Sequence, residues 1–329
     1  MAQQAAEPVT PPEHLHEVVS AIRGGIGRVI VGQHALIDRL LIALFTNNHA
    51  LIEGVPGLAK TLTVQSLSES LHASFSRIQF TPDLLPADIT GTLIFNPREG
   101  EFETRRGPIF ANIVLADEIN RAPAKVQSAL LEAMQERQVS IGGETHPLPD
   151  PFLVLATQNP IEQEGTYPLP EAQLDRFMMK ILVDYPDRDD ERAILQQSLD
   201  AELVPVEHVA GAEEIRALRP AIRAVEVNEP LREYILRLID ATREPTRYRL
   251  DDLTPLINYG ASPRAATFLA RGAQAYAFVQ GRDYATPDDV KALAADVLRH
   301  RIVLTYEAEA QSVSAEDLVS RLLEGVGIP

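Results

Sequence analysis

One stretch decides the fold: Ile52-Glu53-Gly54-Val55-Pro56-Gly57-Leu58-Ala59-Lys60-Thr61-Leu62. It begins as a short apolar strand, continues into a glycine-bearing turn and ends in the start of a helix. Such a loop binds polyphosphate, because successive backbone N–H groups and the positive end of the helix attract an anion. Lys60 would reach the β- and γ-phosphates, and the hydroxyl of Thr61 would ligate Mg²⁺. The stretch therefore predicts a nucleotide site formed by residues 54–62.

The loop departs at one position from the general pattern G-x-x-x-x-G-K-[ST], because the residue before Lys60 is Ala59 and not glycine. The added methyl group is tolerable if this position has a helical φ angle, and Gly57 supplies an earlier permissive site. The alternative is a chance strand, turn and helix with an exposed lysine. Further motifs must decide between the two interpretations.

The composition excludes several classes of function. The chain has 329 residues, which favours two domains, and a net charge of −17 with a pI near 4.9. This acidic balance argues against a large nucleic-acid or anionic-membrane surface. The absence of cysteine excludes disulfides, thiolate zinc sites and thiol nucleophiles. No apolar run approaches the length of a membrane helix, and residues 1–12 lack a secretory signal, so we expect a mobile arm on a cytoplasmic protein.

The second informative run is Asn112-Ile113-Val114-Leu115-Ala116-Asp117-Glu118, an apolar strand that ends in two carboxylates. Ligands of open α/β sheets bind at the carboxyl ends of the strands. Asp117 is therefore placed to hold Mg²⁺, directly or through water, and Glu118 to orient and deprotonate an attacking water. The alternative is a solvated acidic pair that merely ends a strand.

A third apolar strand, residues 152–157, is followed by Gln158-Asn159-Pro160. The amide of Asn159 could hydrogen-bond the γ-phosphate or the attacking water. Asparagine is also a common turn residue before proline, so the local sequence alone does not decide between these roles.

The chain as a whole alternates strands and helices up to about residue 185 and is then dominated by helical periodicity. Two β-hairpins, at residues 91–104 and 138–145, interrupt the α/β pattern. Pro186-Asp187-Arg188 marks a boundary. We therefore predict an arm at residues 1–12, an α/β domain at residues 13–185 and a helical domain at residues 186–329.

Taken together, the motifs resemble those of the AAA+ ATPases of the MoxR family. The resemblance extends from residues 29–33 to residues 322–326, and Ala59 matches the loop of this family. It implies an α/β AAA+ P-loop core with a parallel sheet and inserted β-hairpins, followed by an all-α lid domain. Five runs carry it: Gly54-Val55-Pro56-Gly57-Leu58-Ala59-Lys60-Thr61, Leu115-Ala116-Asp117-Glu118-Ile119-Asn120-Arg121-Ala122-Pro123, Ala156-Thr157-Gln158-Asn159-Pro160, Glu171-Ala172-Gln173-Leu174-Asp175-Arg176-Phe177 and Gly260-Ala261-Ser262-Pro263-Arg264.

The resemblance also implies roles for single residues. Val31, Gly32 and Gln33, within residues 29–33, would line the adenine pocket, and Asn159 would be the first sensor residue. Arg176 would be the arginine finger that reaches the nucleotide of the neighbouring subunit. Arg264 would be the second sensor, and a cation at a helix start favours an anionic partner. Arg176 could instead pair with Asp175 or Glu171, and Arg264 could be a solvated charge.

An arginine finger supplied to a neighbour implies a homo-oligomer, by family analogy a hexameric ring. The two hairpins resemble those of the helix-two-insert branch, whose members act on protein clients, often with a partner that carries a von Willebrand factor type A domain. The leading expectation is an ATPase that remodels or matures protein clients. ATP is expected rather than GTP, because no Asn-Lys-x-Asp signature occurs. A nucleic-acid motor and a non-cycling ATP-gated adaptor are the alternatives.

Overall fold

The computed structural model describes residues 13–161, 165–199 and 206–328, so the predicted arm lies outside the described residues. The chain divides into two compact units. One comprises residues 21–213, and the other combines residues 13–20 with residues 214–328. The helix α7 (Arg188–Leu199) thus belongs to the first unit, whereas the helical periodicity predicts a helical domain from residue 186 onward.

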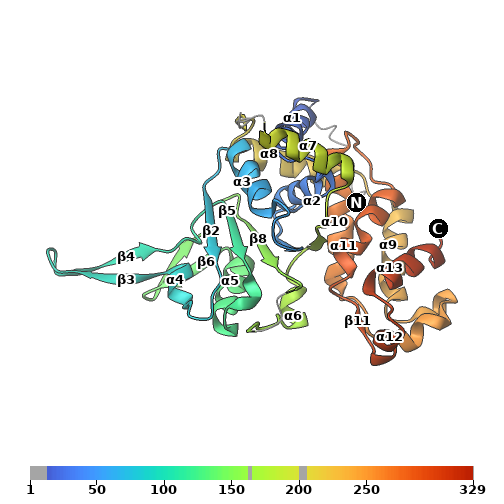
Figure 1. Cartoon of the computed structure of the whole chain (residues 1–329). Coiled ribbons are helices and arrows are strands. Elements are labelled where there is room, and N and C mark those ends of the chain that lie inside the picture. The colour runs from blue at the N-terminus through green and yellow to red at the C-terminus, as the bar shows by residue number, and fades with distance from the viewer. Residues whose placement is uncertain (1–12, 162–164, 200–205, 329) are drawn as a thin grey trace, which may run out of the picture. The chain divides into compact units, whose positions relative to one another are not determined.

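The first unit is built around a five-stranded parallel sheet (Figure 1) with strand order β2-β5-β8-β1-β9. The interior strands β5 and β8 are almost continuously apolar, because the sheet is covered on both faces and leaves them no solvated side. The strands are β1 (Ala50–Glu53), β2 (Phe75–Gln79), β5 (Ile113–Asp117), β8 (Leu153–Gln158) and β9 (Met179–Leu182).

Amphipathic helices bury their apolar faces against this sheet. Val126, Leu130 and Met134 of α5 lie in one buried cluster with alternate residues of β5, Val114 and Ala116. The helix α2 packs against β9, and α3 packs against β5. The remaining helices of this unit complete its frame. The bounds are α2 (His34–Phe45), α3 (Lys60–Ser70), α4 (Pro86–Thr90), η1 (Ile119–Arg121), α5 (Ala124–Glu136) and α6 (Glu171–Leu174). The helix α1 (Glu13–Val29) contributes its residues 21–29 to this unit and residues 13–20 to the other.

Both predicted hairpins are present. The first joins β3 (Gly91–Asn96) to β4 (Glu101–Arg106) and extends away from the sheet (Figure 1). The second joins β6 (Gln138–Ile141) to β7 (Glu144–Pro147) through a tight two-glycine turn. Gly142 and Gly143 have φ angles of +62° and +89°, which glycine adopts without strain.

The second unit is mainly helical, as predicted, with one short antiparallel strand pair. Helix α10 packs against α9 and α11. Its small residues Gly272 and Ala273 are fully buried or nearly so, which permits close helix contact. The bounds are α8 (Ala212–Ala224), α9 (Glu229–Ala241), η2 (Pro245–Tyr248), η3 (Asp251–Leu256), β10 (Ile257–Tyr259), α10 (Pro263–Val279), α11 (Pro287–Leu298), β11 (Val303–Leu304), α12 (Tyr306–Ala310) and α13 (Ala315–Gly325).

Within the described residues, none of the helices combines the length and the apolar character that a membrane crossing requires.

Candidate active site

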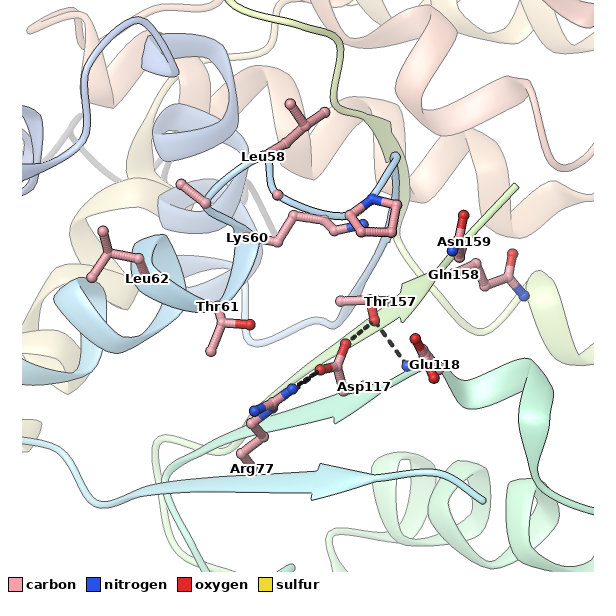
Figure 2. A pocket seen from close by; sticks show the side chains of 13 residues that line it. Leu58, Lys60, Thr61, Leu62, Arg77, Asp117, Glu118, Thr157, Gln158 and Asn159 are labelled. Carbon is pink, nitrogen blue, oxygen red and sulfur yellow. Dashed lines mark hydrogen bonds and ion pairs between the residues drawn. The ribbon is translucent and has the colours of Figure 1, made fainter. Parts of the chain in front are cut away.

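The loop between β1 and α3 opens a pocket of about 430 Å³ at the carboxyl end of the sheet. Figure 2 shows Lys60 and Thr61 approaching from the loop and α3, while Asp117 and Glu118 lie at the end of β5. The pocket is lined by Pro56, Gly57, Leu58, Ala59, Lys60, Thr61, Leu62, Arg77, Asp117, Glu118, Thr157, Gln158 and Asn159. Gly54 and Val55 precede this lining in the loop. The structure therefore brings together the phosphate loop, the two carboxylates and Asn159.

 Ala59 has a φ angle of +53°, in the left-handed region, so the helical φ that we expected to make alanine tolerable is not what the chain adopts. A left-handed conformation brings the β-carbon close to the following carbonyl, which is why glycine is common at this place in the general pattern. The chain thus carries local backbone strain directly before Lys60.

The side chain of Lys60 turns back toward the phosphate loop that precedes it. Its ammonium group donates a hydrogen bond to the backbone carbonyl of Gly54, at the start of the same loop. Burial lowers the pKa of the Lys60 ammonium, while the negative charges of Asp117, Glu118 and Glu53 act in the opposite direction. The ammonium of Lys60 is therefore partly desolvated. Its electrostatic attraction to an anion is stronger in this site than it would be in bulk water.

Asp117 is held through both carboxylate oxygens. Its Oδ1 accepts the Thr157 hydroxyl at 2.6 Å, and its Oδ2 forms an ion pair with the Arg77 guanidinium at 2.6 Å (Figure 2). Thr157 Oγ1 also accepts the backbone N–H of Glu118 at 2.9 Å, so one hydroxyl links the two acidic residues. The carboxylate of Asp117 and the hydroxyl of Thr61 line the same pocket, and hard oxygen donors of this kind suit Mg²⁺.

Glu118 leaves the strand in an unusual backbone conformation, with a φ angle of +55°. Its carboxylate accepts hydrogen bonds from Gln79 at 2.9 Å and from Arg121 at 3.1 Å. The left-handed turn places this carboxylate on the pocket wall instead of continuing the strand alternation. A carboxylate held in this way can accept a proton from a water in the pocket.

Asn159 lines the pocket and is buried, with 7% of its surface exposed. Its side-chain oxygen accepts the backbone N–H of Ile161 at 3.1 Å, which is the turn contact that we weighed against a phosphate contact. The amide nitrogen of the same side chain is a separate donor. The turn role and a role in the pocket are therefore compatible.

A second, mainly apolar pocket of about 150 Å³ adjoins the first and shares Gly57, Leu58, Ala59 and Leu62 with it. Val31 and Gln33, for which the resemblance implies an adenine contact, lie in its wall. Gly32 does not line this pocket. Its φ angle is +75°, and a β-carbon at this position would overlap the carboxylate of Asp190. The other lining residues are Val29, Ile30, Pro186, Ile194 and Gln197.

Several pocket residues were not singled out from the sequence. Thr157 lies in a motif that we quoted without giving it a role, whereas Arg77 lies in a strand with no recognised motif. Ile194 and Gln197 lie on α7, which the helical periodicity assigned to the second domain. Only the packing of α7 within the first unit reveals that they line the apolar pocket.

The two predicted arginines lie elsewhere. Arg176 follows α6 and lines a separate depression with polar and acidic residues of α5, including Glu132 and Glu136. Arg264 is exposed in the first turn of α10, in the second unit. Neither arginine is among the residues that line the pocket around Lys60.

Comparisons with known proteins agree with this architecture. Residues 49–179 match the ATPase family associated with various cellular activities (AAA), and residues 252–322 match the AAA lid domain. The chain is 49% identical to Chaperone MoxR1 of Mycobacterium tuberculosis, covering 92% of this chain and 80% of that protein. It is 31% identical to Protein MoxR of Methylorubrum extorquens, covering 92% and 93% of the two chains. A solved structure described as a candidate ATPase from Cytophaga hutchinsonii has a TM-score of 0.91 at 49% identity, with 96% of each chain covered.

The fold and these matches define an AAA+ core with its helical lid. The chain belongs to the MoxR family of AAA+ ATPases. It is therefore a nucleotide-binding, chaperone-like ATPase from a class of proteins that generally form oligomers.

Proposed function

We propose that this chain couples ATP hydrolysis to the remodelling or maturation of protein clients, together with a partner that carries a von Willebrand factor type A domain. The observation that carries the catalytic part is one pocket that contains the phosphate loop, Asp117 and Glu118. A proton-accepting carboxylate and an anion-binding loop on facing walls are what phosphoanhydride hydrolysis requires.

In this proposal the loop binds the phosphates of ATP. Backbone N–H groups of the loop and the ammonium of Lys60 contact the β- and γ-phosphates, so Lys60 exchanges the Gly54 carbonyl for phosphate oxygen. The apolar pocket beside Val31 and Ile194 takes the adenine ring. Thr61 and Asp117 would hold Mg²⁺, which neutralises charge on the phosphate oxygens when bound.

Glu118 acts as the base that orients and deprotonates the attacking water. Gln79 and Arg121 hold its carboxylate, and Asn159 contacts the γ-phosphate or that water. Arg176 acts on the nucleotide of a neighbouring subunit. This role is supported by the position of Arg176, which does not line the nucleotide pocket of its own chain. Arg264 serves as the second sensor for the nucleotide of its own subunit. These cations stabilise the charge that develops during hydrolysis.

The hairpin of β3 and β4 is the proposed client contact, as in the helix-two-insert branch. Large apolar side chains of this hairpin are exposed, with Phe95 at 50% and Phe102 at 66% of their surfaces. Their rings lie 5.3 Å apart on one face of the hairpin. Exposed apolar residues concentrated on one element favour a protein contact over a purely solvated loop.

The first test uses Glu118→Gln, which preserves shape but removes the base. This variant is expected to bind ATP as the wild type does and to lose turnover by at least about 100-fold. Lys60→Ala is the matched control, since it should lose both binding and turnover. Hydrolysis by Glu118→Gln at the wild-type rate would contradict the role of Glu118.

The second test concerns the partner. The Glu118→Gln protein loaded with ATP is used as bait, with Lys60→Ala plus ATP as the control bait. Recovery of a von Willebrand factor type A protein only with the loaded bait would support the proposal. ATPase activity stimulated by DNA, with affinity that falls steeply with salt, would instead favour a nucleic-acid motor. ATP binding without measurable turnover by the wild type would favour a non-cycling adaptor.

A further inference from the structure

Arg77 is the one basic residue besides Lys60 in the lining of the pocket, within the described residues. It lies on β2, where it is paired with Leu115 of β5. Its Nη2 and Nε atoms lie 2.6 and 3.1 Å from Asp117 Oδ2. The Arg77 side chain is half exposed while that of Asp117 is only 15% exposed. The guanidinium thus covers the outward-facing oxygen of Asp117.

Both carboxylate oxygens of Asp117 already accept hydrogen bonds, and Oδ2 already faces a cation. Thr157 already donates to its Oδ1, and Arg77 donates twice to its Oδ2. A carboxylate oxygen has lone pairs for additional donors, but two positive charges at contact distance from one oxygen repel each other. A divalent cation that uses Oδ2 must therefore weaken or displace the contact with Arg77.

We infer that Arg77 is a positioning residue that competes with Mg²⁺ for Asp117 and so sets the Mg²⁺ concentration at which the protein binds nucleotide. This inference rests on the proposed roles of Thr61 and Asp117. Without Mg²⁺, Arg77 neutralises Asp117 and keeps its carboxylate oriented. With Mg²⁺, Arg77 gives up Oδ2 and remains in the pocket wall.

The competing explanation is a surface ion pair with no influence on cation binding. Such pairs contribute little to stability, and removing one would change the unfolding temperature slightly without changing the response to Mg²⁺. Competition makes the opposite prediction, because loss of the guanidinium frees Oδ2 at all Mg²⁺ concentrations.

The test is a Mg²⁺ titration of the full-length protein with a fluorescent ATP analogue at fixed concentration. The readout is the Mg²⁺ concentration that gives half-maximal nucleotide binding. Arg77→Gln is expected to lower it about threefold, as loss of one partly exposed ion pair permits. Every variant is titrated with the same nucleotide analogue at the same concentration. Formation of the Mg²⁺–nucleotide complex in solution therefore affects all midpoints equally and cancels when the variants are compared.

Arg98→Gln is the control, since it removes the same charge from the exposed turn of the first hairpin and should leave the midpoint unchanged. Arg77→Lys retains a cation but not the forked donor set, and should give an intermediate midpoint. It also keeps the test usable if Arg77→Gln does not fold.

The outcomes separate the inference from the proposed function. If the wild type binds nucleotide without any dependence on Mg²⁺, the proposed roles of Thr61 and Asp117 are wrong. If the wild type depends on Mg²⁺ but the midpoints of Arg77→Gln and Arg77→Lys equal that of the wild type or exceed it, Arg77 does not compete and only the inference is overturned.

Discussion

At the scale of single residues, the pocket is organised by polar contacts that cross from one strand to the next. Thr157 of β8 bonds both Asp117 and the backbone of Glu118, and Gln79 of β2 bonds the carboxylate of Glu118. Each acidic residue is thus held by its neighbours in the sheet. Preorganised groups of this kind need no rearrangement when charge develops on the substrate.

A buried histidine lies in the same unit, away from the pocket lining. His49 Nδ1 accepts the backbone N–H of Val154 at 2.9 Å, and its Nε2 contacts the carbonyl of Met134 at 3.2 Å. Burial, with the nearby charge of Arg137, lowers the pKa of His49 from 6.5 to about 3. The ring is therefore neutral in the folded chain, with Nδ1 as the acceptor.

This lowered pKa predicts a loss of stability in acid. Between about pH 3 and pH 6.5 the unfolded chain binds a proton at His49 that the folded chain does not. The contribution of His49 is thus complete above pH 6.5 and falls by up to about 1.4 kcal/mol per pH unit as the pH decreases through this window. Urea unfolding between pH 5 and pH 7.5 measures the slope, with His49→Gln as the comparison. A ring that titrates near 6.5 by NMR in the folded protein would contradict the prediction.

At the scale of elements, the two hairpins contact each other where β3 meets β6 and the turn that follows it. A β-carbon at Gly142 would lie 2.3 Å from Leu93 Cδ1, so β3 packs directly on the turn between β6 and β7. Gly143, the next residue of the turn, also has a positive φ angle but has open space around it. The absence of a side chain at Gly142 is therefore what permits the contact.

Gly142→Ala is accordingly expected to destabilise the unit by more than Gly143→Ala, by about 1 to 3 kcal/mol. Both substitutions impose alanine on a left-handed backbone, so the difference between them isolates the clash with Leu93. Urea unfolding of the two variants gives this difference. Adding Leu93→Ala should remove most of it, and equal stabilities for the two glycine variants would show that the hairpins do not constrain each other.

At the scale of the whole molecule, the proposed active site requires a second copy of the chain. Preparations of Arg176→Ala alone and Lys60→Ala alone should both be inactive. A mixture in equal amounts forms interfaces that combine an intact loop with an intact Arg176. With random assembly, half of the loops and half of the fingers are intact, so about a quarter of the interfaces should function.

Steady-state ATPase assays across mixing ratios measure this recovery, and size-exclusion chromatography confirms that each variant still assembles. Glu118→Gln in place of Lys60→Ala serves as a second donor of intact Arg176. Wild-type activity in the pure Arg176→Ala preparation would contradict the proposed role of the arginine in the neighbouring site.

The sequence by itself determined the order of the main elements and much of the pocket. The phosphate loop, the carboxylate pair and Asn159 each follow an apolar strand, and parallel strands bring their carboxyl ends to one edge, so these residues could be placed together from local pattern alone. The two hairpins and the helical lid were likewise predictable from periodicity and turn residues.

Only the tertiary structure decided three features. Arg77 lies beside Asp117 because β2 pairs with β5, a contact between residues 40 apart in the chain. Ile194 reaches the apolar pocket because α7 packs within the first unit. Ala59 adopts a left-handed φ angle, although its β-carbon disfavours this conformation. Sequence periodicity reports which face of an element is buried, but pairing partners follow from the packing of distant segments, which no local pattern encodes. The alanine at position 59 likewise does not by itself disclose a left-handed backbone.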